Sequence, residues 1–351
     1  MVIAGYYTYK FYQDLKTISG IQSVADKSAS DKESNSNSGL TKKVAFLEQS
    51  VEVEAPDYSH GKIWEYYFDT NKKEKILDGQ SILLSPNKII LAYSSNNLCG
   101  IVLYNLESKQ TNEIIIGDSN DNQNPCWYRT SKWSPDSKYI VSDGGSSPVR
   151  LRSVFRVSDT KKIADTFRTL GAFDWVNNTQ IAFSDLEESA ERDDGTEISH
   201  NTNLSMLDIS SGGITILKKA TTTTDYIYNF VKDGYIYFDQ YTVALPSDWT
   251  PEKEKANHTA WKVKPDGSNL QQSSEANPNI KTVESLNNVI ANYSQYKELD
   301  NSNKYLPDNT NNNEFLAVLY DNTGNNPSAV LINTSTNKIT EISRDAVNIA
   351  W

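Results

Sequence analysis

Apolar and polar residues alternate along this chain in short runs that turn residues interrupt, which is the pattern of β-hairpins. The clearest example is SKWSPDSKYIV at 131–141, in which Trp133 precedes a Ser-Pro-Asp-Ser turn and an apolar strand from Tyr139 to Val141 follows it. Proline presets φ at the first corner of such a turn, and aspartate bonds the backbone two residues further on. We therefore predict a β-hairpin at this position.

The same form, a large apolar residue, a turn and an apolar strand, occurs five times. The five segments are ILLSPNKIILAYS (82–94), SKWSPDSKYIV (131–141), FDWVNNTQIAFSD (173–185), YNFVKDGYIYFDQ (228–240) and VESLNNVIANYSQ (283–295). Each is followed by a second hairpin with a tight polar turn, so that each repeat has four antiparallel strands. The anchor residues Leu84, Trp133, Trp175, Phe230 and Leu286 recur at intervals of 49, 42, 55 and 56 residues. Four strands at this period indicate a β-propeller.

The two ends of the chain complete a sixth repeat. RDAVNIAW, which ends at Trp351, is a first strand without a second, and TKKVAFLEQ at 41–49 is a second strand without a first. KIWEYYFDTNKKEKIL at 62–77 follows as a normal second hairpin. We therefore predict an all-β, six-bladed β-propeller over 42–351, closed by the C-terminal strand joining the N-terminal blade. Such closure removes free sheet edges.

The hairpin WSPDSKYIVS, followed by VFRVSDTKKI, resembles the repeat of TolB-type six-bladed propellers and is similar to the propellers of prolyl-oligopeptidase-type and dipeptidyl-peptidase-type enzymes. The resemblance extends from Lys42 to Trp351, although only the repeat at 131–168 is close to the family pattern. It implies a fold and not one activity. Those peptidases carry their serine on a G-x-S-x-G elbow in a separate α/β-hydrolase domain, and no such elbow occurs in this sequence.

The segment at 1–41 is predicted to be a short helix followed by a Ser/Asn-rich linker. Its first residues, MVIAGYYTY, are apolar but too few to span a bilayer. Two interpretations stay open: these residues are the end of a longer membrane anchor with tyrosines at the interface, or they belong to a short helix that contacts nothing. An apolar tip, a polar tether and a globular body favour an extracytoplasmic protein, in the periplasm or on the cell surface, that is membrane-anchored.

Negative charge is concentrated in a few predicted loops. The chain has 34 basic and 45 acidic residues, and its net charge of −11 argues against nucleic-acid binding. The loops expected between the second and third strands of four blades are long and carry charges of −3, −6, −2 and −1, at 47–62, 184–202, 239–260 and 294–313. The equivalent loops at 94–99 and 143–150 are short and neutral. An acidic, long-looped binding face is therefore predicted.

The densest acidic stretch is DLEESAERDDGTEIS at 185–199. The candidate binding residues are Asp185, Glu187, Glu188, Glu191, Asp193, Asp194 and Glu197, together with Trp249 in the loop of the fifth blade. One interpretation is an electronegative rim that attracts a basic protein or peptide, or collects divalent cations. The other is an acidic loop that serves only solubility. An exposed tryptophan is a candidate contact residue, although it can equally fold under its own loop.

The sequence offers few candidates for catalytic or metal-ligating residues. The three histidines are scattered, and DSNDNQN at 118–124 lacks the glycine and the terminal glutamate of a calcium loop. We therefore expect no cofactor and no catalytic or metal-ligating residues, with calcium as the one alternative. Cys99 and Cys126 are both expected near the same face of adjacent blades, so that they form either a disulfide or two buried thiols.

The pattern favours a non-enzymatic module that binds a protein or peptide or acts as a scaffold. Two alternatives stand beside it. One is a hydrolase or lyase with its site in the central channel, which clustered carboxylates of raised pKa would support. The other is a regulatory propeller whose catalytic partner is a separate chain.

Overall fold

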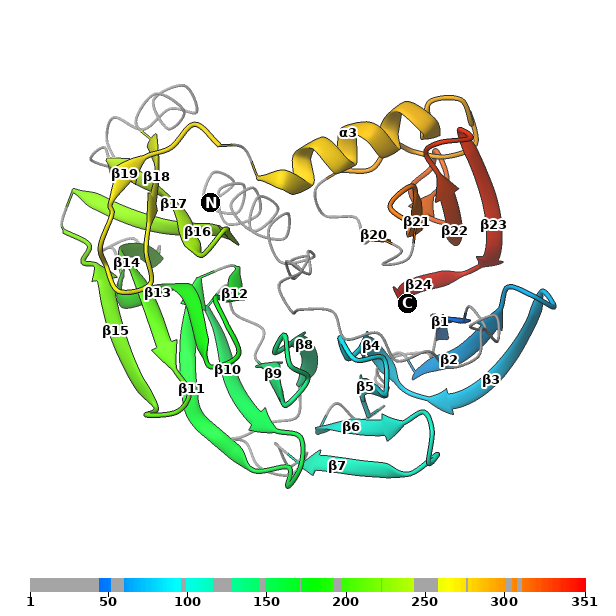
Figure 1. Ribbon diagram of the computed structural model, residues 1–351, viewed down its shortest axis with the longest axis horizontal. Helices are drawn as coiled ribbons and strands as arrows, with labels where there is room; N and C mark the ends of the chain where they lie inside the picture. Colours follow the sequence, from blue (N-terminus) through cyan, green and yellow to red (C-terminus); the bar gives the residue numbers. More distant parts are fainter. Residues whose placement is uncertain are drawn as a thin grey trace, which may run out of the picture. The chain divides into compact units, whose positions relative to one another are not determined.

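In the residues that the computed structural model describes, the chain forms six four-stranded antiparallel sheets and one helix (Figure 1). The structure describes residues 44–51, 60–95, 99–115, 128–144, 149–170, 172–191, 197–221, 223–242, 258–275, 277–300, 305–307 and 311–351. The all-β class and the six four-stranded units predicted from the repeats are thus confirmed. The helix and linker predicted at 1–41 lie outside the described residues. Among the described residues, no helix combines the length and apolarity that crossing a membrane requires.

The described chain divides into two compact units. The first comprises Ser131–Lys281 and holds three of the sheets. Their strands are β8 (Arg129–Trp133), β9 (Tyr139–Gly144), β10 (Val149–Arg156) and β11 (Lys162–Leu170); β12 (Phe173–Trp175), β13 (Gln180–Glu191), β14 (Glu197–Asp208) and β15 (Gly213–Lys218); and β16 (Thr224–Lys232), β17 (Tyr235–Thr242), β18 (His258–Val263) and β19 (Gln271–Gln272). In each sheet the strands lie in sequence order.

The hairpin predicted at 131–141 is confirmed as β8–β9. Side-chain hydrogen bonds of Ser134 and Asp136 close its turn. The Ser134 hydroxyl donates to the Asp136 carboxylate at 2.7 Å and accepts the backbone N–H of Tyr139 at 2.9 Å. The turn Ser85-Pro86-Asn87 is closed by the same two kinds of bond. The side chains thus satisfy backbone donors that the turn leaves without a strand partner.

The cores of the first unit lie between successive sheets. Val141 and Val154 pack against Trp175, Phe183 and Leu207 of the next sheet. A second cluster joins the sheets β12–β15 and β16–β19 through the buried residues Ala172, Ala182, Leu204, Tyr228, Ile236, Phe238 and Val263. The five predicted anchor residues are all buried, so the anchor tryptophans Trp133 and Trp175 serve core packing.

The second unit comprises 44–130 and Thr282–Trp351 and holds the other three sheets. Their strands are β1 (Val44–Val51), β2 (His60–Tyr67) and β3 (Lys72–Asp78), joined by β24 (Ala346–Ala350); β4 (Gln80–Leu84), β5 (Ile90–Ser94), β6 (Gly100–Asn105) and β7 (Thr111–Ile115); and β20 (Tyr305–Pro307), β21 (Glu314–Tyr320), β22 (Pro327–Asn333) and β23 (Lys338–Arg344). Strand β24 pairs with β1, with Phe46 opposite Ala350. The C-terminal strand therefore completes the first sheet as predicted, while the closure of all six sheets into one ring stays a prediction.

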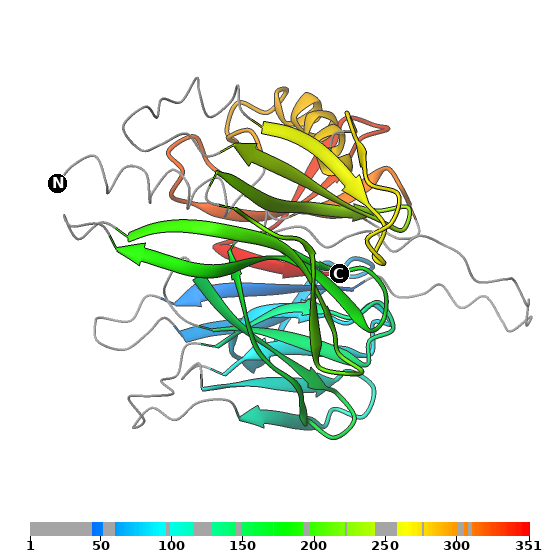
Figure 2. The ribbon, with the colours of Figure 1, turned by 90° about the vertical axis from the view of Figure 1, so that its left-hand side faces the viewer.

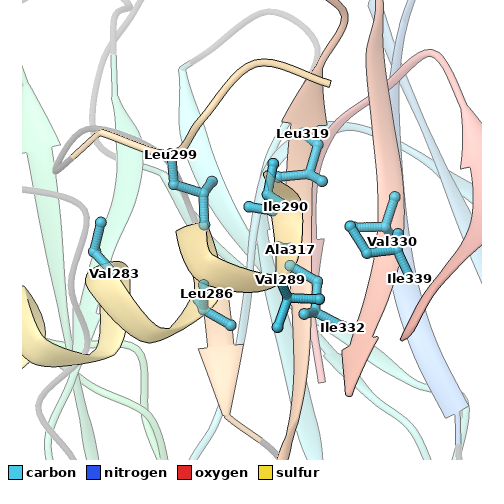
Figure 3. Close-up of a cluster of buried hydrophobic side chains, with 10 residues drawn as sticks. All are labelled: Val283, Leu286, Val289, Ile290, Leu299, Ala317, Leu319, Val330, Ile332 and Ile339. Atoms are coloured by element: carbon cyan, nitrogen blue, oxygen red, sulfur yellow. The ribbon is translucent and has the colours of Figure 1, made fainter. Parts of the chain in front are cut away.

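The hairpin predicted at 283–295 is wrong, because this segment begins within the helix α3 (Pro278–Ile290). Four of its apolar residues recur at helical spacing and enter a core with strands β21 to β23 (Figure 3): Val283, Leu286, Val289 and Ile290. Asn287, predicted as a turn residue, instead exchanges two hydrogen bonds of 2.8 Å with the backbone of Leu299. The first strand of this sheet is β20, which lies inside the loop predicted at 294–313.

Candidate functional site

The described residues of the acidic stretch predicted as a loop at 184–202 lie in paired strands, 184–191 in β13 and 197–202 in β14, so this part of the prediction is wrong. Strands β13 and β14 pair with each other along their whole length, whereas β12 and β15 pair only with the ends nearest the 176–179 turn. Beyond those ends, 185–191 and 197–203 pair only with each other in the part of the chain that the structure describes. Figure 2 shows these two green strands running on side by side. We call this part of the hairpin the acidic ribbon.

Two hydrogen bonds fasten the base of the acidic ribbon to β16. The backbone N–H of Tyr228 donates to the hydroxyl of Ser184 at 2.7 Å. On the other strand, the backbone N–H of Thr202 donates to the carboxylate of Asp225, also at 2.7 Å. The bond between Tyr228 and Ser184 is buried, and the bond between Thr202 and Asp225 is partly buried. Because both strands are fixed in this way, the acidic ribbon leaves its sheet in a defined direction.

The acidic ribbon brings together most of the predicted binding residues. Asp185, Glu187, Glu188 and Glu191 lie on β13, and Glu197 lies on β14. In the strand register Glu191 stands opposite Glu197, and Glu188 stands opposite His200. Asp193, Asp194 and Trp249 lie outside the described residues. The structure therefore places five predicted carboxylates on one hairpin.

Sequence reasoning missed a second feature, a buried polar chain that joins three sheets. The ammonium of Lys132 on β8 donates to the backbone oxygen of Phe173 at 2.7 Å and to the carboxylate of Asp174 on β12. The hydroxyl of Tyr228 on β16 donates to the other oxygen of Asp174 at 2.6 Å. Lys132, Asp174 and Tyr228 are only 7%, 8% and 1% exposed. We call these three residues the polar chain.

A further buried cation lies beside the polar chain. The guanidinium of Arg152 lies 4.5 Å from the centre of the Phe173 ring and 3.8 Å from the carboxylate of Asp143. The Lys132 ammonium lies 5.4 Å from the same ring. Two cations therefore share one aromatic ring and are balanced by two carboxylates, which is the condition under which charges are tolerated in a protein interior.

One signal in the sequence could have identified part of the polar chain. Lys132 and Asp174 each stand directly before the anchor tryptophan of their sheet. Tyr228 reaches the equivalent position because the strand register shifts by one residue between Tyr228 and Phe230. Aligning the repeats on their anchors would have shown a cation and an anion at the same position of two successive sheets, but it places Asn229 and not Tyr228 at that position of the third.

Replacing Tyr228 by Phe is expected to remove a loss of stability in alkali. Burial, and after it the neighbouring Asp174 carboxylate, raises the pKa of Tyr228 well above its ordinary value of 10.0. The phenol therefore stabilises the fold fully below pH 10.0, and this contribution is lost as the pH rises toward the higher pKa of the folded state. The difference in free energy of unfolding between wild type and Tyr228→Phe, measured in urea from about pH 8 to about pH 11, should shrink. A difference that stays constant would contradict this assignment.

Among the described residues, the carboxyl groups with clearly displaced pKa values are displaced downwards. Hydrogen bonds donated by Lys232 and Lys262 lower the pKa of Glu275 to about 2. Hydrogen bonds likewise lower the pKa values of Asp266 and Asp321. A general acid needs the opposite displacement, so these three groups do not favour the enzyme alternative. Within the described ranges, no group of three or more His, Cys, Asp or Glu is placed to hold a metal ion.

Two remaining predictions concern the cysteines and calcium. Cys99 takes part in a disulfide. Cys126, the other cysteine of the chain, lies outside the described residues, so that the pairing of Cys99 with Cys126 stays a prediction. The calcium alternative at 118–124 also lies outside them.

No protein-family model and no curated protein matches the chain. Among solved structures, it is similar to TolB from Acinetobacter baumannii, at 12% identity and a TM-score of 0.41 over 89% of this chain and 67% of that one. It is also similar to the β-propeller domain of the trilobed protease from Pyrococcus furiosus, at 10% identity and a TM-score of 0.41 over 86% of this chain and 83% of that one.

A third similar structure is the acylaminoacyl peptidase of Pyrococcus horikoshii. The identity is 10% and the TM-score 0.43, over 85% of this chain and 44% of that one. The chain thus spans less than half the length of the peptidase. The resemblance to TolB and to peptidase propellers expected from the repeats is therefore found among solved structures at low identity, and no activity is inferred from it.

Proposed function

We propose that this chain is a protein- or peptide-binding module, that its binding surface is the acidic ribbon, and that its partner presents a basic segment. The observation that carries the proposal is a hairpin of 12-residue strands that continues past its sheet from a buried, hydrogen-bonded base. The stretch 185–199 holds seven acidic residues and one basic residue. A loop that served only solubility would need neither regular strands nor a fixed base.

Charge supports the choice of a basic partner. Like charges directly opposite each other across a strand pair are unfavourable, and Glu191 stands opposite Glu197. A lysine or arginine from a partner would relieve this repulsion and would be attracted from a distance by the concentrated negative charge. The paired backbone also offers an edge to which an extended segment can add as a further strand.

The same proposal places the module outside the cytoplasm, tethered to a membrane through its N-terminal segment. Two observations support this location. MVIAGYYTY is an apolar, tyrosine-rich start followed by a polar linker. Cys99 takes part in a disulfide, and disulfides persist mainly in oxidising compartments.

Reversing the charge of the acidic ribbon is expected to abolish binding to a basic peptide. The probe is a short synthetic peptide of alternating lysine and threonine, titrated by fluorescence anisotropy. The triple variant Glu187→Lys, Glu188→Lys and Glu191→Lys should weaken binding at least about tenfold, because the attraction becomes repulsion. Wild-type affinity should also fall as salt rises from about 0.05 to about 0.5 M.

The control changes the net charge equally at exposed glutamates outside the acidic ribbon, with Glu74→Lys, Glu107→Lys and Glu284→Lys. It should retain affinity within about threefold, because these three glutamates are not part of the proposed binding surface. Equal losses in both triple variants would show that net charge alone attracts the peptide, and the acidic ribbon would then not be the site.

A further inference from the structure

One edge strand of each described sheet is β3, β7, β11, β15, β19 or β23. We call these the outer strands, and β15 differs from the other five. The outer strands β3, β7, β11 and β23 each carry at least one charged side chain at an inner position, and β19 is only two residues long. Strand β15 (GITILK) has five uncharged residues before its final Lys218. Ile214 and Ile216 on this strand are 47% and 42% exposed.

An unprotected edge of this kind has a physical meaning. A strand at the edge of a sheet offers a row of backbone donors and acceptors to any extended chain, and charged side chains are the usual way to block such pairing. The strand pairings that involve β15 in the described chain are all with β14. Two isoleucines exposed beside that open edge would stabilise an added strand by burying apolar surface against it.

We infer that β15 binds an extended peptide, which adds antiparallel to its free edge and carries apolar residues at alternate positions and acidic residues at its N-terminal end. The acidic end of the peptide is inferred from the positive charge of β15 and its flanks, because the stretch 209–219 contains two lysines and no acidic residue. In an antiparallel pair the N-terminal end of the peptide lies opposite Lys218, the last residue of β15. An aspartate there would make a favourable cross-strand pair.

A second copy of the chain fits this edge less well. Each copy carries a net charge of −11, so two copies repel each other as they approach. Two exposed isoleucines also supply far less apolar surface than the roughly 1,200 Å² that a stable protein interface buries. An edge-adding peptide instead derives most of its affinity from backbone hydrogen bonds. The inference does not depend on the acidic ribbon, which selects the opposite charge.

The test compares two synthetic peptides of alternating valine and threonine, one beginning with two aspartates and one beginning with two lysines. So that the acidic ribbon does not attract the lysine peptide, both peptides are titrated against the triple variant Glu187→Gln, Glu188→Gln and Glu191→Gln. This background variant should bind the aspartate peptide about tenfold more tightly than the lysine peptide. Lys218→Glu should invert this preference. Lys338→Glu, the matched change at the first residue of outer strand β23, should leave the preference unchanged.

A second variant separates the edge itself from its charge. Ile214→Lys combined with Ile216→Lys should weaken both peptides at least about tenfold, because charged side chains block strand addition. The control Ile280→Lys changes an isoleucine that is 40% exposed on α3 and should have no effect. Unchanged affinity in the double variant, or equal binding of both peptides by the background variant without the ribbon charges, overturns the inference. A third outcome also overturns it: wild type binds neither peptide but self-associates in sedimentation, and the double variant does not self-associate. The occupant of the edge is then a second copy of the chain.

Discussion

Lys132→Met is expected to lower the free energy of unfolding by about 3–5 kcal/mol, because it leaves a buried carboxylate without its cation. Lys132 donates to Asp174 and to the backbone oxygen of Phe173, and both of the charged side chains are almost completely buried. The hydroxyl of Tyr228 remains as a donor to Asp174, but a neutral donor does not balance a buried negative charge. Urea unfolding of wild type and variant at neutral pH measures the difference.

A control and a second variant make this prediction specific. Lys138 pairs with Asp136 at 3.3 Å, but its side chain is 73% exposed, so Lys138→Met should cost less than about 1 kcal/mol. Removing the charge on both sides, with Lys132→Met and Asp174→Leu, should recover a large part of the lost stability, because the uncompensated charge disappears. If the double variant is no more stable than Lys132→Met, the loss comes from packing and not from the charge.

Features held by residues close together in the sequence could be predicted, and features held by residues far apart in the sequence could not. Turns such as Ser134-Pro135-Asp136-Ser137 are closed by bonds between residues at most five positions apart, so the sequence around them was sufficient. The polar chain joins residues 42 and 54 positions apart, which no local pattern can reveal. The comparison of equivalent positions in successive repeats contains that information for Lys132 and Asp174, but not for Tyr228.

The acidic ribbon shows a different limit. Aspartate and glutamate are depleted in strands, so 185–199 was predicted as a loop. The structure instead continues the register that begins in the buried pair Ile181 and Leu207. The preference of single residues against a strand is weak compared with a strand register that packing has already set. Here the packed ends of β13 and β14 determine the conformation of their polar ends.

The helix α3 was missed because its apolar residues fit two patterns. Leu286, a pair of asparagines and the apolar pair Val289-Ile290 match the anchor, turn and strand of the other repeats. The same residues, together with Val283, also match one face of a helix. Two signals favoured the helix and were not used: Pro278 is its first residue, and Asn277 directly precedes it. The packing of these residues on β21 to β23 then fixes the helical pattern.

Asn288→Pro is expected to lower the free energy of unfolding by about 3 kcal/mol or more, because proline in a helix interior removes a backbone hydrogen bond and clashes with the preceding turn. Asn288 is exposed on α3, so no buried contact of its side chain is lost. Asn288→Ala is the matched control, and it should be neutral or stabilising because alanine favours a helix. In a hairpin turn, which the sequence pattern favoured, these expectations would be reversed, since alanine there would lose the turn preference of asparagine.

The side of α3 that faces the sheet provides an independent test of the same packing. Leu286 is completely buried in the cluster that α3 forms with Ala317, Leu319 and Val330. Leu286→Ala should therefore cost about 2–5 kcal/mol, from the lost transfer free energy and the cavity that remains. Ile280→Ala, at an exposed position of the same helix, should cost less than about 1 kcal/mol. If proline at 288 is tolerated while Leu286→Ala is severe, the segment is buried but not helical, and the hairpin would have to be restored to this sheet.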